Sequence, residues 1–539
     1  MDTRMPHNLP RLLAVLAAFL VFGLLLTFRL GAREMALDEA ISVGHADPAE
    51  LHYDAFHPPG YYWLLHRWDA VVGESDGAVR AFSVLGAVGA AGLVWLLARA
   101  LLEPGEDVLA LWLFVLSPFG LLYLRMGRYF ALTLVVALAV AYLALLARRQ
   151  GKVGHYLGLG LAAAALVRVD YIPSLFLPLI YLWLLAEALR RGRFLHWALA
   201  AALPVAALAY GLSGAVFGAH SIAGTPAGHA AGGATAVALK LLLPFYAALV
   251  GETTDFWRFY LTLPVLAAGA VLWGAGLAAL ARRRETERGW LLLPWPLAVV
   301  AVTAVLSTAA AAEPWPRVSS LCLFALPFFL MTVAAGVSAW GGRRIEDSRA
   351  ARPRGPEAGP AGWKPAPRGA VLGPVLFAVL LAGQIYGVYN YEARREFLNP
   401  GYNVPWRQVV GLIQTQGQAG DVAVAWWDGE VQRYWRGPVR FTDLVDPTLT
   451  WRPLPQEVAA FPRGGATVWV IDRDRGSDQA RALTDKLLQR LRAAGGVETP
   501  YRLLAYAPAE RYWRRRLGGG PGAEAYLTLH RFTPSPPPY

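Results

Sequence analysis

Residues 12–39 read LLAVLAAFLVFGLLLTFRLGAREMALDE, and this stretch indicates the class of fold. Its apolar run, 12–30, is long enough to cross a bilayer as a helix, because a span needs about 20 mostly apolar residues. Arg4 and Arg11 precede the run, and no convincing A-x-A-like cleavage site follows it. We therefore expect an uncleaved spanning helix with a cytoplasmic N-terminus. The run ends shortly before two adjacent carboxylates, Asp38 and Glu39, which should lie at the membrane surface.

The composition of the whole chain is that of a protein that lies mostly within a bilayer. Of its 539 residues, 56% are hydrophobic and 16% are charged, whereas soluble domains carry about 25% charged residues. The net charge is +12, and many arginines form short clusters between apolar runs. That pattern is the positive-inside signature and does not form a basic stripe on a soluble domain, so we expect no nucleic-acid partner. The single cysteine, Cys322, excludes an intramolecular disulfide framework.

Eleven apolar runs are candidate transmembrane helices, and they lie at roughly 12–30, 78–101, 107–124, 129–147, 154–168, 172–189, 195–217, 259–281, 290–311, 318–340 and 369–390. Arginine-rich clusters follow the fourth, sixth, eighth and tenth runs, so these ends should be cytoplasmic. The acidic segment 103–107 after the second run is the exception. Residues 236–250 are apolar but short, and they contain Lys240 and Pro244. We expect an interfacial or re-entrant helix there, on the outer side, where Lys240 can reach the interface.

The chain divides into four regions by composition. Residues 1–340 form a transmembrane module in which 31–77 is the first extracytoplasmic loop. Residues 341–368, rich in Pro, Gly, Ala and Arg, predict a disordered cytoplasmic linker, and 369–390 is the last span. Residues 391–539 predict a small extracytoplasmic α/β domain, with strands at 422–427, 467–474 and 526–532 and a helix over 478–494. No internal repeat is visible, which disfavours the transporter folds that are built from repeats.

The loop 31–77 concentrates groups that could carry chemistry. LDEAISV should begin a short helix, and residues 61–68 should form an amphipathic interfacial helix whose start is set by Pro58 and Pro59. An exposed loop of this length also holds acidic residues and histidines by default, and an interfacial aromatic helix can be a mere anchor. The residues alone leave both interpretations open.

Arginines on the outer side strengthen the functional interpretation. Arg125 and Arg128 lie in the loop after the third run, Arg168 is the last residue of the fifth, and Arg317 precedes the tenth. Arg125 is most simply a helix-end arginine that reaches the interface, and Arg168 should pair with Asp170. Cations on the side where topology disfavours them nevertheless indicate an anionic partner, for which a lipid phosphate is the simplest candidate.

Four motifs carry a resemblance, and in this sequence they are Asp38-Glu39, His57-Pro58-Pro59-Gly60-Tyr61-Tyr62, Gly73-Glu74-Ser75…Arg80 and Ser117-Pro118-Phe119…Arg128-Tyr129. In this order they resemble the bacterial relatives of the protein O-mannosyltransferases, which include the lipid A aminoarabinose transferases and the Rgt-type glycosyltransferases. The resemblance covers about the first 150 residues well, and the later spans only by hydropathy. Arg317 with Pro327 is similar to a further element of the family, although Val318 replaces its tyrosine.

The resemblance implies a polytopic α-helical membrane glycosyltransferase of the GT-C fold in the cytoplasmic (inner) membrane. Such enzymes transfer a sugar from a polyprenyl phosphate to an extracytoplasmic glycan, lipid or protein. Asp38, which matches the first-loop aspartate of the family, would be the general base of an inverting transfer, and Glu39 would support it or orient the acceptor. Arg128, Arg317, Lys240 and His57 would bind the donor phosphate. Tyr61, Tyr62 and Tyr129 would shape the site.

The resemblance implies no required cofactor. A divalent cation is an alternative, because oligosaccharyltransferases of this broad fold use one, but His45, Asp47, His52, Asp54 and His57 match no ligand motif by their spacing. Phosphate-binding glycine motifs of nucleotide-sugar enzymes are missing from the sequence.

Three other functions stay open from the sequence. A flippase for polyprenyl-linked sugars would need polar residues in the middle of the membrane, and the runs hold almost none. A sugar-binding sensor would not need eleven spans. An enzyme of the same fold could act on another acceptor. The sequence does not identify the sugar, the acceptor or the oligomeric state.

Overall fold

The computed structural model describes residues 9–45, 58–213, 234–254, 258–283, 287–305, 307, 318–350, 369–426, 429–444, 453–463, 465–473, 478–505 and 525–535. The chain forms two compact units. The membrane unit comprises Met1–Leu30 and Ser42–Leu398, and the C-terminal unit comprises Gly31–Ile41 and Asn399–Tyr539. The segment 31–41, which contains Asp38 and Glu39, therefore belongs to the same unit as the C-terminal domain.

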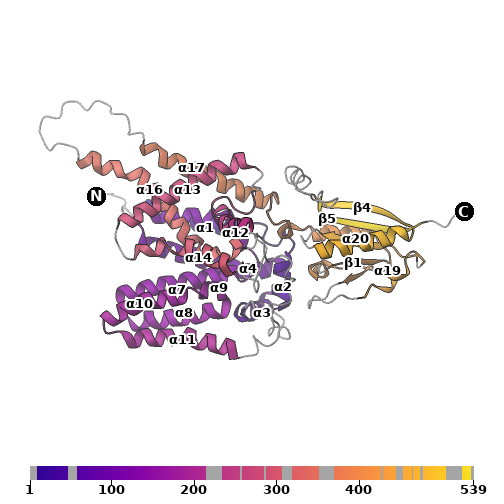
Figure 1. Ribbon diagram of the computed structural model, residues 1–539, viewed down its shortest axis with the longest axis horizontal. Helices are drawn as coiled ribbons and strands as arrows, with labels where there is room; N and C mark the ends of the chain where they lie inside the picture. The colour runs from indigo at the N-terminus through magenta and orange to yellow at the C-terminus, as the bar shows by residue number, and fades with distance from the viewer. Residues whose placement is uncertain are drawn as a thin grey trace, which may run out of the picture. The chain divides into compact units, whose positions relative to one another are not determined.

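The membrane unit is helical (Figure 1). Its helices are α1 (Leu9–Thr27), α3 (Gly60–Val72), α4 (Asp76–Leu101), α5 (Glu106–Val115), α6 (Pro118–Leu124), α7 (Phe130–Gln150), α8 (Val153–Val169), α9 (Tyr171–Ser174), α10 (Leu177–Arg190), α11 (Phe194–Ser213), α12 (Ala234–Val250), α13 (Phe259–Arg282), α14 (Pro294–Val305), α15 (Val318–Leu321), α16 (Leu326–Ala350) and α17 (Gly369–Glu392). Helix α2 (Leu37–His45) begins in the C-terminal unit.

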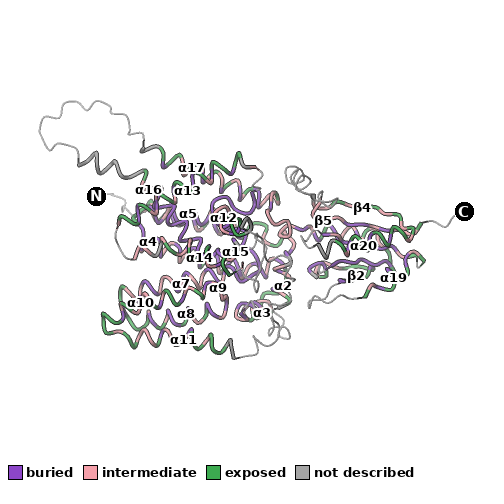
Figure 2. Tube along the Cα trace, in the orientation of Figure 1, coloured by how far each residue is buried: buried purple, intermediate pink, exposed green. Residues whose placement is uncertain are grey.

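Each of the eleven apolar runs contains helix, but three of them are divided between two α-helices, namely 107–124, 172–189 and 318–340. Among the described residues, seven helical segments are long and apolar enough to cross a membrane, and α5 with α6 forms an eighth candidate that is bent by 56°. Helices α8, α11 and α14 are shorter apolar helices, as is α12, the expected interfacial segment. Exposed residues on α10 and α11 include Leu182, Leu195 and Val205, as expected of helices that face lipid (Figure 2). The chain is a multi-pass membrane protein.

Ion pairs place several helix ends at one end of the membrane unit. Arg11 at the start of α1 pairs with Asp107 at the start of α5. Arg283, which follows α13, donates to Glu106 at 2.9 and 2.6 Å, and Arg149 at the end of α7 donates to Glu287 at 2.7 Å. The acidic segment that broke the arginine pattern is thus paired with arginines from distant helices. These contacts agree with the expected alternation of the spans.

At the opposite end, two buried arginines bind backbone carbonyls in the turn that follows the last residue of α1, Thr27. Arg80 of α4 donates to the Leu30 carbonyl at 3.0 Å. Arg125 donates to the Phe28 carbonyl and pairs with Glu392, the last residue of α17. Cations at a helix C-terminus satisfy free carbonyl groups and interact favourably with the helix dipole. Arg125 lies at the end of α6, as expected, and it also joins the turn after α1 to the end of α17.

The C-terminal domain is a five-stranded sheet with helices on both faces. The strand order is β2-β1-β3-β5-β4, where β1 (Val422–Ala425) pairs in parallel with β2 (Arg440–Asp443) and β3 (Val468–Arg473), and β5 (Ala525–Pro534) pairs antiparallel with β3 and β4 (Gly496–Ala505). Helix α18 (Trp406–Gln416) packs on one face. Helices α19 (Gln456–Ala460) and α20 (Asp478–Ala493) pack on the other. All four residues of β1 are buried, as expected for a central parallel strand.

The expected fold class is confirmed, with two differences in detail. Helix α16 continues to Ala350, so residues 341–350 are helical and do not begin the expected linker. Residues 351–368 lie outside the described part of the chain. Strands β2 and β4 were not predicted from the sequence. β2 is short and exposed at its first residue, and β4 contains Pro500, a residue that normally argues against a strand.

Candidate active site

Asp38 and Glu39 lie in the first turn of α2 and have different environments. The Ala36 amide donates to Glu39 Oε2 at 3.0 Å, so the Glu39 carboxylate caps the start of its own helix, as in one half of a capping box. Glu39 is 2% exposed, whereas Asp38 is only half-buried. Glu39 therefore has a structural task, and Asp38 is the more accessible carboxylate of the pair.

Arg128 lies in the tight turn between α6 and α7 of the membrane unit. Its amide donates to the Met126 carbonyl at 2.7 Å, and Ser83 of α4 donates to its carbonyl at 3.4 Å. The guanidinium stacks on the rings of Tyr129 and Phe130, at 5.4 and 5.8 Å from their centroids. Arg128 is 8% exposed. A buried cation of this kind requires compensation by an anion or by aromatic faces.

Asp170 supplies negative charge near Arg128. It lies between α8 and α9, where it accepts hydrogen bonds from the Ile172 amide at 2.9 Å and from Thr133 Oγ1 at 3.2 Å. Burial raises the pKa of the Asp170 carboxyl to about 6, although these two hydrogen bonds and the charge of Arg128 lower it. The expected pairing of Asp170 with Arg168 is wrong, since the Arg168 guanidinium instead lies over the Tyr210 ring, 5.4 Å from its centroid.

The three tyrosines expected to shape the site form one aromatic cluster in the membrane unit. The Tyr61 ring lies 5.5 Å from that of Tyr62 and 6.4 Å from that of Tyr129, measured between centroids. Helix α3, which carries Tyr61 and Tyr62, begins very close to the backbone of Arg168, because a Cβ at Gly60 would lie 2.3 Å from the Arg168 carbonyl oxygen. Only glycine fits at this position, and it brings the cluster against the end of α8.

Lys240 lies in α12, and it is 5% exposed. Thr303 of α14 donates to its carbonyl at 3.3 Å. Its helix was expected to be interfacial, with the ammonium group reaching toward water. The side chain is instead buried within the membrane unit.

Glu252 is a buried acidic residue that was not among the site residues predicted from the sequence. It follows α12 in the segment Gly251–Thr254, and its carboxylate accepts hydrogen bonds from the Tyr123 hydroxyl at 2.7 Å and from the Ser319 hydroxyl. Its backbone carbonyl accepts from the Leu398 amide at 2.8 Å. Burial raises the pKa of the Glu252 carboxyl to about 7. The sequence signal was an acidic residue between a glycine and two threonines, directly after an apolar helix.

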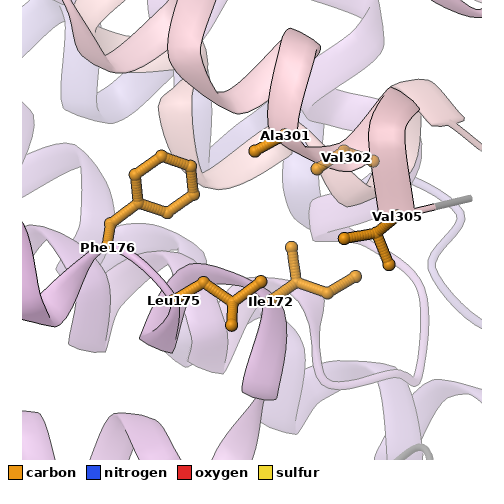
Figure 3. Close-up of a pocket in the computed structure, with 6 residues that line it drawn as sticks. All are labelled: Ile172, Leu175, Phe176, Ala301, Val302 and Val305. Carbon is orange, nitrogen blue, oxygen red and sulfur yellow. The ribbon is translucent and has the colours of Figure 1, made fainter.

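A small apolar pocket lies close to Asp170 in the chain. Figure 3 shows its lining, which consists of Ile172, Leu175, Phe176, Ala301, Val302 and Val305. The amide of Ile172 donates to Asp170, so the first lining residue of the pocket is tied to the carboxylate near Arg128.

Two expected site residues, His57 and Arg317, lie outside the described part of the chain. So do Asp47, His52 and Asp54, which belong to the set considered for a divalent cation. Within the described ranges, no group of three or more His, Cys, Asp or Glu side chains could hold a metal ion. The remaining expected residues divide between the units, with Asp38 and Glu39 in the C-terminal unit and the others in the membrane unit.

Known proteins similar to this chain share its fold. ArnT from Cupriavidus metallidurans in its apo state matches with a TM-score of 0.55 at 12% identity, over 97% of this chain and 98% of that chain. The same protein bound to undecaprenyl phosphate matches with a TM-score of 0.53 at 13% identity, over 98% of both chains. The oligosaccharyltransferase AglB from Archaeoglobus fulgidus, in complex with an inhibitory peptide and a dolichol-phosphate, gives 0.51 at 11% identity, over 98% of this chain and 89% of that chain.

The sequence comparisons match a smaller part of the chain than the structural comparisons do. No curated protein gives a significant sequence match. The family model of dolichyl-phosphate-mannose-protein mannosyltransferases matches residues 56–211, which include α3, Arg128 and the aromatic cluster. The chain is therefore a membrane protein with the GT-C fold, and its residues 56–211 match the family model of dolichyl-phosphate-mannose-protein mannosyltransferases.

Proposed function

We propose that this protein is a glycosyltransferase that moves a sugar from a polyprenyl-phosphate donor to an extracytoplasmic acceptor with inversion at the anomeric carbon. The observation that carries the proposal is the buried Arg128, which is held between aromatic rings at the end of the helix bundle opposite the ion-paired basic ends. The fold shared with ArnT bound to undecaprenyl phosphate supports a donor of this class.

The reaction needs a base and a site for a leaving phosphate. The acceptor hydroxyl attacks the anomeric carbon while the bond from that carbon to the phosphate oxygen breaks, and the bonding electrons leave with the polyprenyl phosphate. Asp38 takes the proton of the acceptor hydroxyl. Arg128, with Arg317, Lys240 and His57, stabilises the negative charge that grows on the leaving group, so that group needs no proton.

The donor has a lipid tail, which confines the reaction to the membrane surface. The tyrosine cluster of Tyr61, Tyr62 and Tyr129 is suited to the headgroup level, where aromatic side chains concentrate. The ion-paired basic ends would be cytoplasmic by the positive-inside rule. The site would then face the extracytoplasmic side of the cytoplasmic membrane, and the reaction would need no cofactor.

The test uses the full chain in nanodiscs with a panel of radiolabelled polyprenyl-phosphate sugars and a membrane extract as the source of acceptor. We expect release of polyprenyl phosphate from one donor by the wild type and by Asp485→Asn, a change at an exposed helix residue of the C-terminal domain. Asp38→Asn should lower the rate of release by a factor of at least about 100, to a small residual rate, while donor binding persists. Tight binding without release by the wild type would point instead to a flippase or a sensor. Equal release by wild type and Asp38→Asn would remove Asp38 from the chemistry.

A further inference from the structure

The C-terminal domain binds the segment that carries Asp38 by two polar contacts. The Met35 amide donates to the Tyr434 hydroxyl at 2.6 Å, and Arg407 Nη1 donates to the Ala32 carbonyl at 3.3 Å. The Arg407 guanidinium also lies over the Tyr434 ring, 5.2 Å from its centroid. Both ends of the short stretch that precedes α2 are thus held by side chains located almost 400 residues later in the chain.

Tyr434 is itself held in a fixed position by the core of the domain. It ends the 3₁₀ helix η7 (Gly429–Tyr434) and packs against the hydrophobic cluster beneath α18. In the same helix, Glu430 is buried and accepts a hydrogen bond from the buried Arg473 of β3 at 2.8 Å. The neighbouring Trp435 donates to the Val439 carbonyl at 2.7 Å. A hydroxyl on a segment with this support can define the position of its partner.

The position of Met35 is transmitted to Asp38 over a single helical turn. Met35 and Ala36 are 1% and 4% exposed. The Ala36 amide is bound by Glu39, and the amides of Glu39 and Ala40 both donate to the Ala36 carbonyl at 3.0 Å. Asp38 lies within this closed turn, so its backbone is fixed once Met35 and Ala36 are fixed.

We infer that Tyr434 and Arg407 are positioning residues for Asp38, and that the C-terminal domain carries the base of the reaction. This inference rests on the proposed function, and it gives the domain a role in catalysis that does not depend on binding sugar itself. A general base must be held within hydrogen-bond reach of the proton that it removes, and a displacement of about 1 Å can cost a factor of about 100 in rate.

The test combines turnover with hydrogen exchange in the full chain in nanodiscs. Tyr434→Phe removes the hydroxyl but keeps the ring beneath Arg407. Its matched control is Tyr501→Phe, which removes a hydroxyl that donates to Gln416 at 2.9 Å in the same unit. We expect Tyr434→Phe alone to speed exchange of the Met35 amide about tenfold. We expect the same variant to lower kcat about tenfold while leaving KM for the donor within a factor of about two.

A double variant makes the kinetic result specific to Asp38. If Tyr434 acts through that carboxylate, Tyr434→Phe should lower turnover in the wild-type background and have no further effect on the residual rate of Asp38→Asn. Unchanged exchange at Met35, or faster exchange with unchanged kcat, would overturn the inference. The exchange measurement does not depend on turnover. Faster exchange at Met35 in Tyr434→Phe, in a protein that transfers no sugar, would confirm the contact between these residues. The same result would refute the proposed function, and with it the role of Tyr434 in catalysis.

Discussion

The Tyr123 hydroxyl donates a 2.7 Å hydrogen bond to the carboxylate of Glu252, a residue 129 positions later in the chain. Ser319 binds the other oxygen of the same carboxylate. The three residues come from α6, from the segment after α12 and from α15, so a single buried acid joins three parts of the membrane unit. This arrangement leads to the first prediction.

The thermal stability of the protein should depend on the protonation of Glu252. The folded chain keeps this proton up to about pH 7, whereas a carboxyl with the ordinary value of 4.5 loses it much earlier. The folded state therefore binds more protons between these values, and the free energy of unfolding falls as the pH rises through this window. Glu252→Gln should keep an oxygen acceptor for Tyr123 or Ser319 and weaken the dependence to the part that Asp170 contributes. Melting temperatures in detergent from pH 4.5 to 8 would check this, with Glu457→Gln, on the exposed Arg440–Glu457 pair, as the control. A wild-type slope that persists in Glu252→Gln would contradict the assignment.

Two glycines set the distance between α13 and α16. A Cβ at Gly276 would lie 1.9 Å from the Thr332 carbonyl oxygen, and a Cβ at Gly336 would lie 1.8 Å from the Leu272 carbonyl oxygen. Small residues at such crossings let membrane helices approach closely. Gly276→Ala should therefore destabilise the protein by more than about 2 kcal/mol, seen as a lower melting temperature or loss of monodisperse protein. Gly274→Ala, in the same helix and without a neighbour within 4 Å, should be tolerated. Similar losses from both changes would disprove the close crossing.

The pair of Arg283 with Glu106 should contribute far more to stability than an exposed pair. Glu106 is 2% exposed and receives two hydrogen bonds from one guanidinium. Glu106→Gln removes the buried carboxylate and leaves Arg283 only the half-exposed Glu103, 4.0 Å away, so it should cost about 2–4 kcal/mol. The corresponding change in the Arg440–Glu457 pair, Glu457→Gln, should cost less than about 1 kcal/mol. The two melting temperatures in detergent test the difference, and equal costs would show that burial at Glu106 does not matter.

Arg128 should matter to donor binding as a bidentate group and not only as a charge. Lysine keeps the charge but cannot present the planar pair of donors that matches a phosphate. We expect Arg128→Lys to reduce release of polyprenyl phosphate by a factor of about 10–100. Arg168→Lys, at an arginine that lies over Tyr210, is the matched control and should have a small effect. A loss of release in Arg168→Lys alone would transfer the proposed role from Arg128 to Arg168.

Local patterns in the sequence predicted much of the fold. Hydropathy over about 20 residues is enough to locate the apolar helices, since a helix in lipid must satisfy its backbone internally. The alternation of arginine clusters predicted which helix ends share a side, and the ion pairs of Arg11, Arg149 and Arg283 agree with it. Buried strands of the C-terminal domain, such as β1 and β3, were visible as short apolar runs.

The partners of individual charged residues could not be predicted in this way. Asp107 lies in the acidic segment that did not fit the alternation of arginine clusters, and in the structure it pairs with Arg11. Glu39 was expected to support Asp38 or to orient the acceptor, and its bond to the Ala36 amide at the start of its own helix was not foreseen. Arg168 was expected to pair with Asp170 two residues away, yet Thr133 and the Ile172 amide bind that carboxylate. In each case the deciding contact is a single hydrogen bond or ion pair, which has no periodic signature along the chain.

The sequence was thus sufficient to predict a polytopic helical protein with a carboxylate pair after its first span. Lipid solvation and charge asymmetry act on each segment separately, so both can be evaluated without the tertiary structure. Only the tertiary structure could assign residues 31–41 to the C-terminal unit. The bond between Met35 and Tyr434 joins residues 399 positions apart, and its formation depends on how the whole domain packs around Tyr434. Burial likewise raises the pKa of Glu252 only after α6, α12 and α15 have come together around it.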